Sequence, residues 1–247
     1  MKAFVIRYLP LLILGGIWEA LPQLGLVDRA QLPPPSEVAV AWLELLYSGD
    51  LAANGLSSLV VLVQALLLSV SVGILLGVSM ARFSLAQDMF EPVLKALYPV
   101  PKSALIPIMI IWFGLGATSK VASVFLGCLL PIVTSTFYGA RGVEQTLIWS
   151  SQSVGARPVA VIRDVIIPAA MPDILAGIRN AIAIGFILLI SAELLIGQVG
   201  IGYLISFLGE AGLYPGMFAA ILTVSAAGFL ADRAFVLVMR RALAWRQ

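Results

Sequence analysis

The chain has 247 residues, of which 61% are hydrophobic and 11% charged, whereas soluble domains average about 45–50% apolar and about 25% charged residues. This surplus of apolar residues predicts an integral membrane protein, and the long unbroken apolar runs favour helices over a barrel of short alternating strands. The net charge of +2, the absence of histidine and the single cysteine, Cys128, argue against nucleic-acid binding, disulfides, ordinary zinc sites and histidine-based catalysis.

Six apolar segments of the chain are predicted to form transmembrane helices, at about residues 3–24, 55–81, 104–115, 121–138, 173–196 and 216–239. The first could be a signal peptide, but no small-x-small cleavage site follows it, so an uncleaved span is favoured. A proline-rich piece at about residues 32–37 precedes an amphipathic interfacial helix, and a less apolar surface helix is expected at about residues 83–98. The last connection, at about residues 197–215, is rich in glycine.

The distribution of basic residues tests this layout. If the N-terminus is cytoplasmic, 11 Lys and Arg fall on inner segments, 2 on outer segments and 2 within spans, which accounts for all 15. This asymmetry follows the positive-inside rule and places both termini in the cytoplasm. The predicted fold class is therefore an all-α integral membrane protein of about six transmembrane helices.

A polar stretch between the fourth and fifth spans carries the strongest functional signal. The part before Gly155 is compatible with a helix; Gly155 suits a helix C-terminus or sharp turn, and Pro158 permits a new helix to start. A helix, a turn and a second helix on the cytoplasmic face could dock into a soluble partner, or could simply join the two spans.

This stretch resembles the cytoplasmic loop of binding-protein-dependent ABC importer permeases, whose pattern is Glu-Ala-Ala, three residues, Gly, nine residues, Ile, one residue and Leu-Pro. Four residues fall at the required intervals: Gly155, Val165, Ile167 and Pro168. Trp149 replaces the usual Glu, and two serines replace the Ala pair. Further segments, including 99–107, 111–116, 191–193 and 200–205, are similar to permeases of the nitrate, sulfonate, taurine and bicarbonate group.

The resemblance implies a type I ABC importer permease fold with four regions. Residues 1–54 would form a transmembrane helix and an outer segment with an amphipathic helix, and residues 55–240 the permease core. Residues 141–170 would be the coupling loop within this core, and residues 241–247 a basic cytoplasmic tail.

The resemblance also implies a function. The chain would form the translocation pathway in the inner membrane as a homodimer with a second permease subunit. Two copies of a cytoplasmic ATPase and a periplasmic or lipid-anchored binding protein would complete the importer. The chain has no Gly-Lys dipeptide and so no ordinary phosphate-binding loop; it would be no enzyme and bind no cofactor, with ATP and Mg held by the partner ATPase. A small anion such as a sulfonate, taurine, nitrate or bicarbonate is the expected substrate. An aromatic acid or vitamin precursor is the alternative substrate class, and a self-contained channel or secondary transporter is the alternative function.

Two groups of site residues follow, and neither is catalytic or metal-binding. The residues expected to couple the chain to the ATPase are Trp149, Ser150, Ser151, Gly155, Ala156, Arg157 and Pro168. The candidate pathway or gate residues are Ser191, Glu193, Gly200 and Gly202. Glu193 has a second interpretation, as a structural carboxylate bonded to backbone groups of the glycine-rich connection.

Two further features concern packing inside the membrane. Arg179 is expected either to extend to the interface or to pair with Asp232, because an unpaired charge in a span is costly. Small residues spaced four apart, at Gly73 and Gly77 and again from Gly177 to Gly185, permit close helix approach, either within the chain or at a dimer seam.

Overall fold

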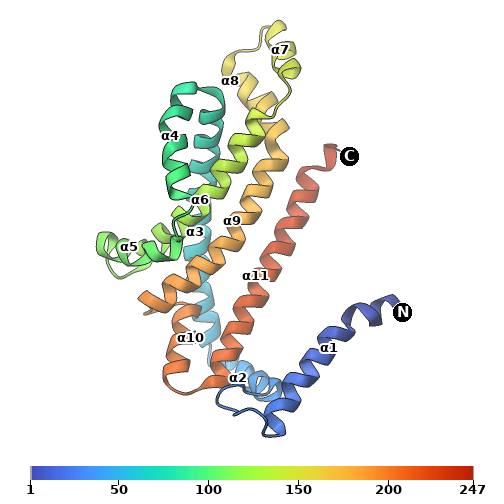
Figure 1. Cartoon of the computed structure of the whole chain (residues 1–247), viewed down its shortest axis with the longest axis vertical. Coiled ribbons are helices and arrows are strands. Elements are labelled where there is room, and N and C mark those ends of the chain that lie inside the picture. Colours follow the sequence, from blue (N-terminus) through green and yellow to red (C-terminus); the bar gives the residue numbers. More distant parts are fainter. Residues whose placement is uncertain (1, 247) are drawn as a thin grey trace. The chain divides into compact units, whose positions relative to one another are not determined.

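The computed structural model describes the backbone of residues 2–246 and the side chains of residues 9–10, 12–195 and 197–245, and its elements are helical (Figure 1). In chain order they are α1 (Lys2–Gln23), α2 (Pro35–Tyr47), α3 (Asp50–Arg82), α4 (Ser84–Leu97), η1 (Lys102–Leu105), α5 (Ile106–Phe113), α6 (Ala117–Arg141), α7 (Gln145–Ser153), α8 (Pro158–Val161), η2 (Ile162–Ile166), α9 (Ile167–Ile196), α10 (Ile201–Glu210), α11 (Tyr214–Ala242) and η3 (Ala244–Arg246). No strand occurs within residues 2–246, which confirms the predicted all-α class.

Four stretches of helix are long and apolar enough to cross a membrane: Asp50–Arg82, Ala117–Arg141, Pro158–Leu195 and Tyr214–Ala242. They contain the second, fourth, fifth and sixth expected spans. The first expected span forms α1, whose earliest side chains lie outside the described part of the chain, so its crossing of the membrane stays a prediction, as does the side on which the termini lie.

The expected third span, at about residues 104–115, takes a different form. The helix α5 has eight residues, and at about 1.5 Å per residue it reaches about 12 Å, well short of a hydrocarbon core of about 30 Å. The structure instead pairs Ser84–Leu97 with Lys102–Phe113, and the two pieces meet at an angle of 97°. Together they pass as one broken span or a re-entrant loop. Pro101, which has no N–H to continue the first helix, precedes the second piece.

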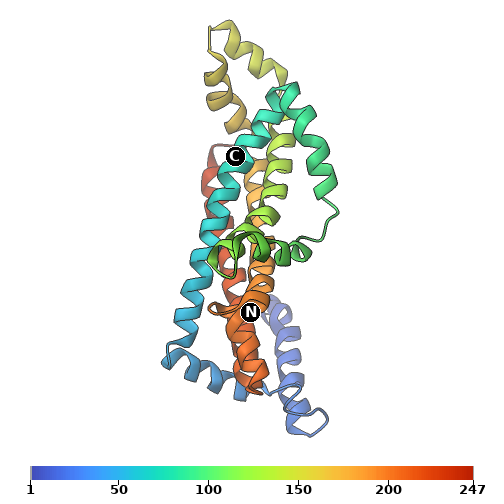
Figure 2. The same cartoon turned by 90° about the vertical axis from the view of Figure 1, so that its left-hand side faces the viewer.

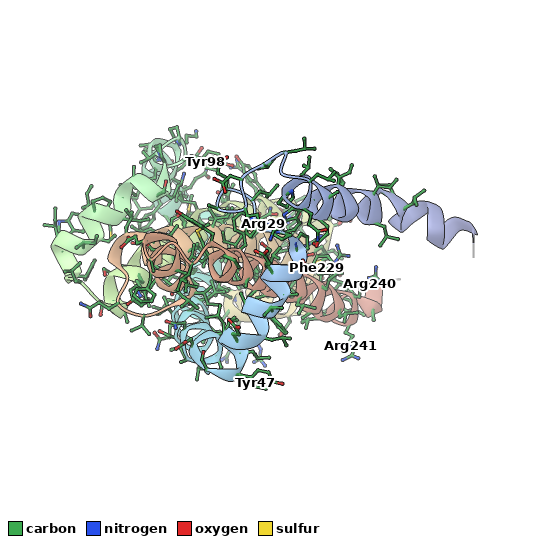
Figure 3. The ribbon with its side chains drawn as sticks, turned by 90° about the horizontal axis from the view of Figure 1, so that it is seen from below. Arg29, Tyr47, Tyr98, Phe229, Arg240 and Arg241 are labelled. Atoms are coloured by element: carbon green, nitrogen blue, oxygen red, sulfur yellow. The ribbon has the colours of Figure 1, made fainter. Side chains whose placement is uncertain are left out.

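The chain divides into two compact units: unit 1 comprises Met1–Ser58 with Glu193–Ala227, and unit 2 comprises Leu59–Ala192 with Gly228–Gln247. In unit 1, the core consists of α10 side chains packed on α11, with Leu204, Leu208 and Ala220 buried. The Trp18 indole of α1 donates to the Pro33 carbonyl at 3.0 Å, which ties α1 to the proline-rich piece before α2. Tyr47, at the end of α2, is exposed and points outward (Figure 3).

In unit 2, the helices α3, α6 and α9 run side by side (Figures 1 and 2) and share a buried cluster that includes Ala65, Cys128 and Ala181. Glycines permit this close approach. A Cβ on Gly77 would lie 2.6 Å from the Cβ of Thr136, and one on Gly177 would lie 2.7 Å from a side-chain carbon of α6. The small-residue faces therefore pack against other helices of the same chain, which confirms the expectation of packing within the chain. Arg240 and Arg241 project from the C-terminal end of α11 (Figure 3).

Candidate functional site

The loop of unit 2 that carries α7 and α8 contains the turn expected at Gly155. The helix α7 ends at Ser153, and Gly155 has φ +84°, in the left-handed region that favours glycine. The Gly155 N–H donates to the Gln152 carbonyl at 2.9 Å, and the Ala156 N–H donates to the Ser151 carbonyl at 3.1 Å. These two bonds form a Schellman motif, which satisfies the last carbonyls of α7 and reverses the chain.

The second helix of the loop begins as expected. Pro158 is the first residue of α8, where its missing N–H costs nothing, and Arg157 is the exposed, extended N-cap residue whose carbonyl accepts from the Val161 N–H at 3.0 Å. The π-helical turn η2 then leads into α9, in which Pro168 is the second residue. Because Pro168 has no N–H to bond the carbonyl four residues earlier, a local departure from α geometry is expected just before it.

The loop has a buried side and an exposed side. Ile148 of α7, Val161 of α8 and Ile166 of η2 are buried against Ala170 and Ile174 of α9. This cluster fixes the orientation of both short helices at the ends of α6 and α9 (Figure 1).

The exposed side carries large apolar side chains. The side chains of Trp149, Val154 and Val159 are 61%, 83% and 75% exposed. Ser150 is exposed, and Ser151 is half-buried with its hydroxyl donating to the Ile148 carbonyl at 2.8 Å. Large apolar side chains grouped at a loop tip are typical of a surface that binds another protein.

Three of the four candidate gate residues meet in unit 1, where Glu193 of α9 reaches the start of α10. Its side chain is fully buried, and its carboxylate accepts from the Ser58 hydroxyl at 2.7 and 2.9 Å and from the Gly202 N–H at 2.9 Å. The Ser58 hydroxyl in turn accepts from the Ile201 N–H, and the Asn54 amide oxygen accepts from the Gly200 N–H, each at 2.9 Å.

These bonds explain how a carboxylate can be buried here. The first N–H groups of a helix have no partner within the helix, and the helix dipole places partial positive charge at that end. Three side chains of α3 and α9 supply acceptors to the first three N–H groups of α10, counting its N-cap Gly200. We name this set, Asn54, Ser58, Glu193 and Gly200–Gly202, the α10 clasp.

Glycine is required at position 200 for two separate reasons. Its φ is +122°, which L side chains rarely adopt, and a Cβ there would lie 2.2 Å from the Glu193 Oε1 atom. The α10 clasp matches the second interpretation of Glu193, a structural carboxylate bonded to backbone groups of the glycine-rich connection. Ser191 takes no part in it, because its hydroxyl donates to the Ile187 carbonyl at 2.8 Å within α9.

Sequence reasoning missed Asn54 and Ser58. Both lie at the start of the second expected span, where two polar residues four apart occupy one face of a helix. That spacing was the available signal, and it gives no indication of the partner, which lies 135 residues further along the chain for Ser58 and Glu193.

A bidentate ion pair joins two spans of unit 2. The Arg179 Nε and NH2 atoms lie 2.6 and 3.0 Å from the two carboxylate oxygens of Asp232. The side chains are 42% and 30% exposed. The pairing, one of the two outcomes expected for Arg179, is confirmed, and it neutralises both charges inside the apolar helices.

The chain is similar to membrane components of transport systems. Residues 69–243 match the family described as binding-protein-dependent transport system inner membrane component. The taurine transport system permease protein TauC of Escherichia coli (strain K12) is 30% identical, over 95% of this chain and 87% of that protein. The putative aliphatic sulfonates transport permease protein SsuC of Bacillus subtilis (strain 168) is 33% identical, over 96% of this chain and 86% of that protein.

A third relative is named for a different substrate. The riboflavin transport system permease protein RibX of Chloroflexus aurantiacus is 31% identical, over 87% of this chain and 80% of that protein. Among solved structures, an inward-facing conformation of the MetNI methionine ABC transporter aligns with a TM-score of 0.63 and 16% identity, covering 75% of this chain and 93% of that one. This likeness concerns the fold.

Proposed function

Because the chain belongs to the family of binding-protein-dependent transport system inner membrane components, we propose that it is the permease subunit of an ATP-binding cassette importer for small sulfonates. The multi-pass helical fold suits a pathway across the membrane. Relatives that cover 95–96% of the chain carry the names of taurine and aliphatic sulfonate permeases, which supports the substrate class. The riboflavin permease relative makes a vitamin-type solute the second candidate substrate.

The observation that carries the proposal is the exposed apolar side of the α7–α8 loop. A permease of this kind does not hydrolyse ATP itself and must receive the energy from a partner that grips it. The loop is held rigidly by Ile148, Val161 and Ile166, and it presents Trp149 and Val159 outward. Buried aromatic anchors dominate binding energy at protein interfaces, so Trp149 takes the central position in docking the ATPase.

The complete importer in this proposal has two copies of the permease, two copies of the ATPase that bind ATP and Mg, and a periplasmic or lipid-anchored binding protein, all at the inner membrane. Closure of the ATPases moves the α7–α8 loops, and the attached spans rock as rigid bodies to alternate access. The α10 clasp holds the connection between α9 and α10 through Glu193, Gly200 and Gly202 while this happens.

Copurification tests the docking surface. The tagged chain is coexpressed with an ATPase encoded beside it, and recovery of the ATPase is compared for the wild type, Trp149→Ala and the control Trp245→Ala. Trp149 and Trp245 are equally exposed at 61%, so neither change removes core packing. We expect Trp149→Ala to lower recovery at least about tenfold, as for an interface hot spot, and Trp245→Ala to leave it unchanged. Equal recovery from all three chains would refute the docking surface.

A further inference from the structure

A cavity of about 240 Å³ lies in unit 2 between α4 and α6. Its apolar wall includes Met80, Leu94 and Phe137, and Tyr98 and Tyr138 also line it. The α7–α8 loop and the α10 clasp contribute none of its lining residues. The cavity therefore shares no lining residue with either of them.

The charged groups beside the cavity favour an anionic ligand. Glu91 is its lining carboxylate, and both carboxylate oxygens are already engaged: Lys95 Nζ lies 2.7 Å from Oε1, and the Gln87 amide donates to Oε2 at 2.7 Å. The Lys95 side chain is 73% exposed. Its ammonium carries three donors, so it can bind a second anion while it holds Glu91.

Two more cations stand over rings of the cavity wall. Lys102 Nζ lies 5.5 Å from the centroid of the Tyr98 ring, and Arg141 Cζ lies 5.5 Å from the centroid of the Phe137 ring. With Lys95, three cations therefore lie at residues of the cavity wall. All three belong to segments that the distribution of basic residues predicts to be cytoplasmic.

The exposed side of α4 next to the cavity is apolar. Phe90 and Leu97 are exposed large apolar side chains, and no residue of this fully described helix is buried. Phe90, Leu94 and Leu97 recur at the spacing of one helix face, and Glu91, Lys95 and Tyr98 recur on the neighbouring face. An anionic group held at Lys95 would thus lie beside a continuous apolar strip.

We propose that this cavity binds an anionic phospholipid, with its phosphate at Lys95 and the hydroxyls of Tyr98 and Tyr138 and an acyl chain along the apolar face of α4. Basic pockets between membrane helices are suited to lipid phosphate groups, and the apolar strip accounts for the rest of the amphiphile. The inference does not depend on the transport substrate or on the ATPase.

Native mass spectrometry of the full chain in detergent tests the proposal. Dioleoyl phosphatidylglycerol and dioleoyl phosphatidylcholine are the probes, since they share acyl chains and differ in charge. Lys95→Gln is compared with Arg29→Gln, because each removes one cation from an ion pair: Lys95–Glu91 at 2.7 Å and Arg29–Glu37 at 2.9 Å. Glycerophosphoglycerol serves as a competitor that carries the headgroup without acyl chains.

We expect the wild-type chain to retain phosphatidylglycerol in preference to phosphatidylcholine. Lys95→Gln should weaken phosphatidylglycerol binding about fivefold, because one basic residue near an anionic headgroup contributes about that factor, and Arg29→Gln should leave it unchanged. An equal effect of the two substitutions, or no preference between the lipids, would overturn the proposal. Full displacement by millimolar glycerophosphoglycerol would overturn the lipid assignment in favour of a free phosphate ester.

Discussion

Replacement of Gly200 by alanine is expected to be among the most damaging single-methyl changes in the chain. The backbone at Gly200, with φ +122° and ψ 161°, lies in a region that is essentially restricted to glycine, which costs about 1–3 kcal/mol for another residue. The added Cβ would also lie 2.2 Å from the Glu193 Oε1 atom. Displacing that buried carboxylate breaks at least one charge-assisted hydrogen bond, worth about 1.5–3 kcal/mol. The expected loss of stability is about 3–6 kcal/mol.

Gly212→Ala is the matched control for this change. Gly212 has φ +74° and lies in the same unit, but a Cβ there would meet no heavy atom within 4 Å. For Gly212→Ala, only the cost of placing a side chain at positive φ, about 1–2 kcal/mol of stability, is expected. Thermal unfolding of the purified chain, followed by fluorescence-detected gel filtration, should show a Tm drop of about 2–8 °C for Gly212→Ala and a roughly threefold larger drop, about 6–24 °C, for Gly200→Ala. Similar drops for both variants would refute the proposed contact between position 200 and the Glu193 carboxylate.

Three further outcomes are expected from the same unfolding assay. Ser58→Ala should cost about 2–4 kcal/mol, because it removes a donor to the buried Glu193 carboxylate and an acceptor for a helix N–H; a neutral result would contradict the α10 clasp. The losses of stability from Arg179→Ala and Asp232→Ala should be less than additive when the two changes are combined, because each single change already removes the ion pair; additive losses would show that the pair contributes nothing. Gly77→Ala should lower the Tm, although alanine is the better helix former, because its Cβ would lie 2.6 Å from a side-chain carbon of α6; a raised Tm would show that α3 and α6 are not so close.

The sequence predicted features that depend on local chemistry. Gly155 indicated a helix end and Pro158 a helix start, and the structure has both. The positive φ of Gly155 and the missing N–H of Pro158 are local properties that need no distant partner. The pairing of Arg179 with Asp232 could also be anticipated, because two opposite charges inside apolar spans each need neutralisation.

Features that depend on distant parts of the chain could not be predicted. The 97° bend between Ser84–Leu97 and Lys102–Phe113 was not predicted, because apolar periodicity alone suggested a short third span. The α10 clasp joins Asn54 and Ser58 to residues about 140 positions later. Nothing local to either segment indicates which distant segment it contacts.

The most direct test of the central claim is substrate uptake into proteoliposomes. The chain is reconstituted in three preparations: alone, with its ATPase, and with its ATPase and binding protein. Uptake of radiolabelled taurine is measured with and without ATP on the side of the membrane that the ATPase faces. If the chain is an importer permease, uptake requires all three proteins and ATP, and it is lost when the chain carries Trp149→Ala. Taurine uptake by the chain alone, or without ATP, would contradict the account and identify a self-contained transporter.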